Sequence, residues 1–181
     1  MKHLTPIFAL SAMVLAACGQ PDAPASDTPA PATPPVETAS AETSPLDTAI
    51  AGAHRSEAER ARDAWRHPKE TLEFFGVESD DKVVELWPGG GWYTNVIAPY
   101  LASGGGTLVA AYFDPNVGDE DRRARISERL EEFKATYADP KFGAIEYSAF
   151  SAESGPLTEP GTADVVLTFR NLHNWMSGGY T

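Results

Sequence analysis

The sequence predicts an α/β fold in which a parallel sheet is flanked by helices. From about residue 55 onwards, short apolar runs alternate with amphipathic stretches. One apolar run, at residues 82–87, leads into a turn formed by Pro88, Gly89, Gly90 and Gly91, and an amphipathic segment follows directly. Strands and helices that alternate in this way are typical of parallel sheets with right-handed crossovers.

Two short helices are expected before the sheet. Ser56 and Glu59 have the spacing of a capping box, which predicts a helix over residues 57–66. A proline opens the next segment, and proline is favoured at the first position of a helix, so a second helix is expected over residues 68–75. Gly76 suits its C-terminal cap.

Four strands and two further helices are expected after these. The helix over 119–138 is the clearest, because its apolar side chains recur on one stripe. The helix over 92–101 contains Pro99, which removes a hydrogen-bond donor and should disturb it. The expected strands cover residues 82–87, 107–113, 144–148 and 164–169.

The first 18 residues predict export. Lys2 precedes an apolar run at residues 4–17, which is too short and poorly flanked for a membrane span. Small residues before Cys18, the only cysteine, resemble the lipobox of bacterial lipoproteins, whose cysteine is lipidated. Gly19, rather than Asp, implies by this resemblance an outer-membrane lipoprotein facing the periplasm. The alternative is an ordinary signal peptide cut at an Ala-x-Ala-like site.

Residues 19–54 predict a disordered tether. Pro, Ala, Ser and Thr dominate this segment, and residues 20–53 contain no aromatic residue and no Lys or Arg. Such a composition cannot bury enough apolar surface to offset the entropy of ordering the chain. Residues 55–181 then have the size of one small domain.

The charge of this domain argues against nucleic acid as a partner. Without the single lysine and five acids of the first 54 residues, 13 basic and 21 acidic side chains remain, a net charge of −8. Phosphate backbones are bound by clusters of Lys and Arg. The one basic cluster, at residues 122–129, is interspersed with acids and predicts a solvated helix face. The four histidines are scattered and lack metal-ligand spacing.

The glycine loop is predicted to bind a ligand. Glycine lets the backbone approach a ligand closely, and a helix N-terminus offers unpaired N–H groups. The alternative is that the three glycines only make a turn, but the strand before them carries an acid, Glu85, and a helix follows. A nicotinamide-binding fingerprint would need a third glycine where Thr94 stands.

Residues Glu85 to Gly91 resemble motif I of the class I S-adenosylmethionine-dependent methyltransferases, in which an acid on the first strand precedes a glycine-rich loop. Residues 106–114 resemble the second strand of that family, and residues 163–175 its fourth strand and the segment after it. Residues 168–175 are similar to a branch of bacterial predicted methyltransferases, some of them lipoproteins. The resemblance implies a Rossmann-like fold and methyl transfer to a small-molecule substrate.

The resemblance also implies roles for single residues. Glu85 would hold the ammonium group of the cofactor's methionine moiety, with Gly89, Gly90 and Gly91 forming the cofactor loop. The alternative for Glu85 is a pairing with a Lys or Arg of the protein. Asp114 would accept from the ribose hydroxyls, or would be only a turn residue.

Further candidates lie at the same edge of the sheet. Asn171 and His173 follow the fourth strand, at the carboxyl edge where open α/β folds bind ligands. His173 would be a general base, since its unperturbed pKa of about 6.5 suits proton removal near neutrality; the alternative is a structural histidine. Trp87 would narrow or reshape the pocket, and Trp92 and Tyr93 would line it or belong to the core.

Two features favour an alternative function. The family's fold has seven strands, whereas the fourth predicted strand lies about a dozen residues before the C-terminus. Residues 55–181 are therefore expected to be the N-terminal portion of a methyltransferase-like domain. Its sheet would be incomplete after the fourth strand, with an apolar edge near Leu167 and Phe169. S-adenosylmethionine is also made in the cytosol, so an exported enzyme would need a supply. The alternative is a non-catalytic, envelope-anchored binding module on the same fold.

Overall fold

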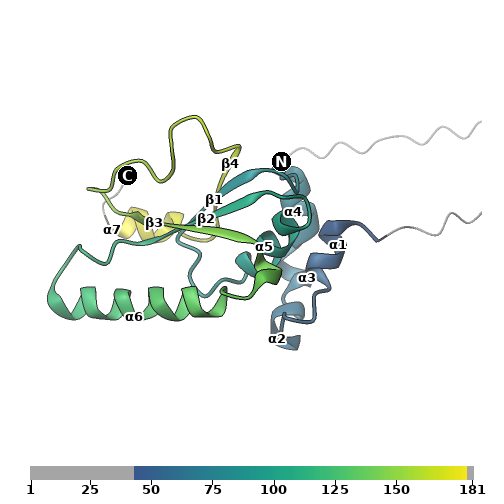
Figure 1. Ribbon diagram of the computed structural model, residues 1–181. Coiled ribbons are helices and arrows are strands. Elements are labelled where there is room, and N and C mark those ends of the chain that lie inside the picture. The colour runs from purple at the N-terminus through teal and green to yellow at the C-terminus, as the bar shows by residue number, and fades with distance from the viewer. Residues whose placement is uncertain (1–42, 179–181) are drawn as a thin grey trace, which may run out of the picture. The chain divides into compact units, whose positions relative to one another are not determined.

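The computed structural model describes residues 43–178, which contain a four-stranded, fully parallel sheet with flanking helices (Figure 1). The strand order is β3-β2-β1-β4, and every neighbouring pair is parallel. The strands are β1 (Lys82–Leu86), β2 (Thr107–Phe113), β3 (Ala144–Phe150) and β4 (Val165–Thr168). The predicted α/β, Rossmann-like fold class is confirmed.

The two faces of the sheet are covered differently. One face, with Val83 and Leu108, packs against helices and belongs to the larger buried cluster. The opposite face, with Val84 and Val109, is covered by the connection between β3 and β4, from which Leu157 packs on it. That connection arches over the sheet on the side away from α6 (Figure 1). Burial on both faces explains why β1 and β2 are almost continuously apolar.

The four expected helices are present, one of them divided in two, and three further helical segments occur at residues 45–50, 140–142 and 172–178. In chain order the helical segments are α1 (Pro45–Ile50), α2 (Glu57–Arg60), α3 (Asp63–Arg66), α4 (Pro68–Phe74), α5 (Thr94–Ala102), α6 (Glu120–Thr136), the 3₁₀ turn η1 (Pro140–Phe142) and α7 (Leu172–Gly178). The helix predicted over 57–66 is divided into α2 and α3. The carbonyl oxygen of Glu59, which a continuous helix would pair with Asp63, accepts instead from the backbone N–H of Arg62 and from the indole N–H of Trp92, at 3.1 Å each.

Pro99 lies inside α5 without ending it. Proline removes the N–H that would bond the carbonyl oxygen four residues earlier, which belongs to Asn95. The Nε2 atom of His54 lies 2.7 Å from that oxygen and satisfies it as the Nε2–H tautomer. A residue from a distant segment therefore compensates for the proline.

The ordered domain begins earlier than the predicted boundary at residue 55. Helix α1 lies inside the segment 19–54, for which the composition predicts a disordered tether. Its Leu46 and Ala49 are buried, and Asp47 pairs with Lys69 at 2.7 Å. The composition of the whole segment conceals this short apolar stretch, which becomes ordered because neighbouring helices provide a surface for it.

The predicted apolar edge of the sheet is exposed at a different residue. Strand β4 pairs with β1, and Val166 is 58% exposed whereas Leu167 is buried. Neighbouring side chains of a strand point to opposite faces, so Leu167 joins the helix-covered core. Phe169 stacks on Tyr93, with ring centroids 3.5 Å apart.

The predicted signal peptide, Cys18 and most of the predicted tether lie outside the described residues, so lipidation and export stay predictions. Among residues 43–178, no helix has the length and apolar character needed to cross a membrane.

Candidate functional site

The loop between β1 and α5 turns sharply. Trp87, Gly89 and Gly91 all have positive φ, at 51°, 61° and 77°. The N–H of Trp87 still bonds the carbonyl oxygen of Ala111, so the strand pairing continues to the start of the turn. A bulky residue at positive φ is an outlier that costs about 1–3 kcal/mol, and such residues cluster at functional sites.

The three glycines of the loop have different surroundings. A Cβ atom on Gly91 would lie 1.9 Å from the hydroxyl oxygen of Tyr137, which donates to the Gly91 carbonyl oxygen at 3.0 Å. Gly91 is therefore needed for close packing of the loop against Tyr137. Gly89 and Gly90 are exposed, and an added Cβ would meet nothing within 4 Å at either position. These two glycines leave space for a ligand.

Glu85 is buried beneath this loop. The residue is only 2% exposed, and its carboxylate accepts a hydrogen bond from the Thr94 hydroxyl at 2.7 Å. Burial raises the pKa of Glu85 to about 7, and the hydrogen bond from Thr94 opposes this rise. No cationic side chain among residues 43–178 forms an ion pair with it. The alternative role, a pairing with a Lys or Arg of the protein, is therefore absent from the described part of the chain.

Two pockets of about 420 Å³ each flank the loop, and Gly89 and Gly90 line both. We call the first the arginine pocket; it lies towards β4 and the N-terminal helices. Its lining includes Glu85, Tyr93, Asn171 and three arginines, Arg62, Arg66 and Arg170.

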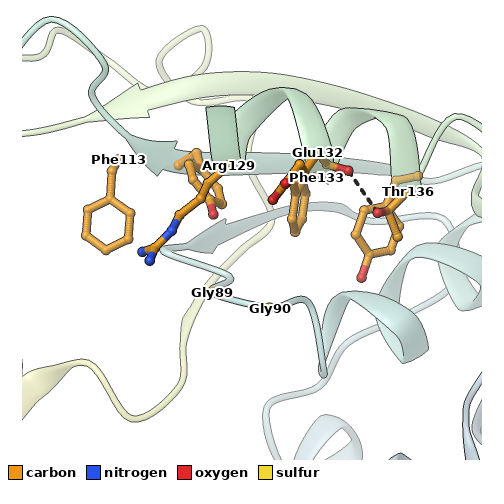
Figure 2. Close-up of a pocket in the computed structure, with 9 residues that line it drawn as sticks. Gly89, Gly90, Phe113, Arg129, Glu132, Phe133 and Thr136 are labelled. Carbon is orange, nitrogen blue, oxygen red and sulfur yellow. Dashed lines mark hydrogen bonds between the residues drawn. The ribbon is translucent and has the colours of Figure 1, made fainter. Parts of the chain in front are cut away.

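We call the second the α6 pocket, because α6 forms one of its walls. Figure 2 shows Arg129 and Phe133 projecting from α6 towards the loop of Gly89 and Gly90. The end of β2 contributes Phe113, and rings make up much of the lining.

Trp87 connects the walls of the two pockets. It lines the arginine pocket, and its ring stacks on Phe113 of the α6 pocket with centroids 4.4 Å apart. It also meets the rings of Phe150 and Trp175 at 5.7 Å. Trp87 thus belongs to an aromatic cluster at the carboxyl edge of the sheet.

The N-terminal helices are fixed against the loop by two aromatic residues. The Tyr93 hydroxyl donates to the carbonyl oxygen of Arg66 at 3.0 Å, and the Trp92 indole bonds Glu59 as described above. Both aromatic residues are buried and both line the arginine pocket, so the two predicted roles coincide.

Asp114 has the contacts of a turn residue. Its carboxylate accepts from the N–H of Asn116 at 2.8 Å and from the Ser151 hydroxyl at 3.2 Å. It lines neither pocket, whereas Tyr112 and Phe113 line the α6 pocket.

Asn171 and His173 have separate surroundings although they are close in sequence. The Asn171 amide lies within donor distance of the carbonyl oxygens of Leu86 and Trp87, at 3.2 Å each, and of the Thr168 hydroxyl at 2.9 Å. It thereby holds the ends of β1 and β4 together at the pocket wall. His173 is exposed on α7 and lines neither pocket.

The three arginines of the pocket were not among the predicted site residues. Arg170 comes directly after the predicted fourth strand, residues 164–169, so the rule that places Asn171 at the carboxyl edge applies to Arg170 as well. Arg62 and Arg66 are four residues apart, but no local pattern shows that α3 faces the glycine loop.

Residues 43–178 contain no group of three or more His, Cys, Asp or Glu side chains that could hold a metal ion. Comparisons of the chain with protein-family models, curated proteins and solved structures give no match. Geometry and side-chain chemistry are therefore what bear on its function.

Proposed function

We propose that this protein is an S-adenosylmethionine-dependent methyltransferase that acts on a small molecule. Buried Glu85 is the observation that carries this proposal. A carboxylate that is removed from water needs a cation or several hydrogen bonds, and the described residues give Glu85 one hydrogen bond and no cation. A ligand with an ammonium group would supply the missing charge.

The residues around the loop fit this cofactor. Gly89 and Gly90 face both pockets, so a long ligand could lie over the loop and extend into each. Glu85 would hold the ammonium group on one side, and the rings beside Phe113 would offer a flat apolar surface on the other. The cofactor supplies a methyl group that is activated by attachment to a sulfonium.

The chain's own contribution to the reaction would be positioning. Methyl transfer by in-line displacement depends mainly on the alignment of the reacting atoms. The two pockets would hold the reactants, and Asn171 would keep the ends of β1 and β4 in place beside them. A general base is not essential for a good nucleophile. His173, the predicted base, faces solvent, and Asn171 already bonds the backbone of β1. These two observations favour the second candidate, a binding module without catalysis.

Calorimetric titration of the full chain tests the cofactor assignment. We expect binding of S-adenosylmethionine or its demethylated product, and no binding of NAD. Glu85→Ala should weaken cofactor binding by about 1.5–3 kcal/mol, the range for a hydrogen bond to a charged group. Binding of NAD would overturn the assignment, and equal affinity of the variant would remove Glu85 from the site. Transfer of labelled methyl to acceptors would distinguish the enzyme from the binding module.

We also propose that the protein is an exported lipoprotein anchored through Cys18 in the outer membrane. The lone cysteine after small residues supports this. A fatty-acid analogue should label the protein in cells, and Cys18→Ser should remove the label. A soluble, unlabelled mature protein would refute the anchor.

A further inference from the structure

We infer that the arginine pocket recognises an anionic substrate, a small molecule with a carboxylate or phosphate group, through Arg62, Arg66 and Arg170. This inference rests on the proposed function, because it names the class of substrate that would be methylated beside Glu85. The recognition itself follows from the pocket's own chemistry.

The three arginines come from distant parts of the chain. Arg62 lies between α2 and α3, Arg66 ends α3, and Arg170 follows β4, yet all three line one pocket of about 420 Å³. The complete chain has a net charge of −12. A concentration of guanidinium groups in one concave site of such an acidic protein creates a local field that attracts anions.

None of these three side chains has a hydrogen bond or an ion pair with another described residue. Arg55, in the same segment, shows the contrast: its guanidinium pairs with Asp63 at 2.6 Å and donates to the carbonyl oxygen of Ile50. The three arginines of the pocket therefore keep their donors available. Arginine presents those donors in a planar fork that matches carboxylate and phosphate oxygens.

Neither of the two carboxyl groups that line the pocket forms an ion pair with these arginines. Glu59 accepts from the backbone and hydroxyl of Ser56 and from the amide of Asn95. Glu85 is buried and bonded to Thr94. The hydrogen-bond partners of both acids are thus residues other than the three arginines.

The arginines also repel one another. Burial lowers the pKa of Arg66 most, and the positive charges of Arg62 and Arg170 lower it further. Arg66 is held in place nonetheless, because its guanidinium lies 4.5 Å from the ring centroid of Trp92. A bound anion would relieve this repulsion.

The backbone of Arg170 supports a functional role. This residue has φ of 63°, a left-handed conformation that bulky side chains rarely adopt. Asn171, which follows it, is fixed to the ends of β1 and β4, so the surroundings impose the conformation. Outliers of this kind persist mainly at functional sites.

The methionine carboxylate of the cofactor is a second possible source of an anion. One arginine fork suffices for one carboxylate, whereas three guanidinium groups line this pocket. We therefore assign the arginines to the substrate, and the experiment distinguishes the two sources.

The test is titration of the full chain with inorganic phosphate at low salt, without cofactor and again with saturating demethylated cofactor. The double variant Arg62→Gln, Arg66→Gln should bind phosphate about tenfold more weakly, equivalent to one charged hydrogen bond lost. The double variant Arg123→Gln, Arg125→Gln is the matched control. It removes the same two charges from exposed positions on α6 that line neither pocket, and phosphate affinity should stay within about twofold.

Arg170→Gly separates binding from folding. Glycine accepts positive φ without strain, so this variant should unfold at a higher temperature than the parent and still bind phosphate several-fold more weakly. Unchanged phosphate affinity in both pocket variants would overturn the inference. Loss of phosphate binding to the parent chain once the demethylated cofactor is bound would assign the arginines to the cofactor's carboxylate instead. Phosphate binding without any binding of S-adenosylmethionine would refute the proposed function and leave the anion site intact.

Discussion

The two sides of the glycine loop have pockets of equal volume that differ in how many charged side chains line them. Both pockets are lined by aromatic rings, but the arginine pocket adds three guanidinium groups without an ion pair among residues 43–178 and a buried carboxyl group, whereas the α6 pocket has one arginine and one glutamate. Gly89 and Gly90 belong to both. The difference indicates that the two pockets bind different parts of a ligand. Charged parts suit the arginine pocket, and a flat apolar part suits the α6 pocket.

The pockets also differ in how the chain builds them. The end of β2 and helix α6 are consecutive elements, so the α6 pocket comes largely from one crossover of the sheet. The arginine pocket brings residues 59–66 together with residues 169–171. Substitutions that affect the shared loop should damage both pockets, and substitutions on one side should damage only that side.

The largest effect is expected from Gly91→Ala, which should damage both pockets together. The new Cβ would overlap the Tyr137 hydroxyl, at 1.9 Å, and the residue would have to keep φ of 77°. Overpacking and left-handed strain together should cost about 4 kcal/mol. Urea unfolding measures the loss. Gly90→Ala is the control, since its Cβ would enter open space, and an equal loss in both variants would contradict this role of Gly91.

The second effect concerns the arginine pocket alone and depends on pH. Burial raises the pKa of Glu85 from 4.5 to about 7, so the folded chain binds more protons than the unfolded chain between these pH values. Stability should therefore fall as pH rises from about 4.5 to 7, by about 3 kcal/mol for this group. Glu85→Gln should remove that slope. The pKa of Glu59 is lowered from 4.5, so the contribution of this group to stability changes only below about pH 4.5, outside this window. Urea unfolding across pH measures the slope, and an identical slope in parent and variant would show that Glu85 is not the titrating group.

A third substitution tests the α6 pocket. Phe113→Ala should weaken cofactor binding by about 1 kcal/mol, because it removes a ring from the apolar wall and the stacking partner of Trp87. This loss should be independent of pH. The loss caused by Glu85→Gln should be larger above pH 7 than below it, since only the ionised carboxylate attracts an ammonium group. Calorimetry at pH 6 and pH 8 compares the loss of cofactor affinity in the two variants. If both losses changed with pH in the same way, the division between the pockets would be contradicted.

The smallest expected effect is an increase in stability. Arg170→Gly should stabilise the domain by about 1 kcal/mol, the left-handed strain less the entropic cost of glycine. Asn171→Ala is the comparison variant in the same pocket wall. The loss of its hydrogen bonds to the end of β1 should destabilise the domain. Thermal unfolding shows whether each variant is more or less stable than the parent chain. Destabilisation by Arg170→Gly would mean that the guanidinium has a structural role.

Local sequence determined much of the sheet and its central loop. Strand β2 coincides with the predicted residues 107–113, because an apolar run between two turn signals has few other solutions. The capping box at Ser56 is present as predicted, with both of its hydrogen bonds formed. The turn after β1 follows from its glycines, since positive φ at Gly89 and Gly91 suits no other residue as well. These features depend on residues that are neighbours in sequence.

Tertiary structure decided the remaining features, because they depend on partners far away in the chain. Helix α1 is ordered only through surfaces that other helices provide, and α2 ends where a tryptophan 33 residues away takes the Glu59 carbonyl. Periodicity cannot show that Arg62 and Arg66 meet Arg170, more than a hundred residues later. The sequence by itself therefore determined the sheet, the loop and the position of Glu85. Only the folded chain decided that Glu85 has no cationic partner among residues 43–178, that Asn171 joins the ends of two strands, and that three arginines converge beside the loop.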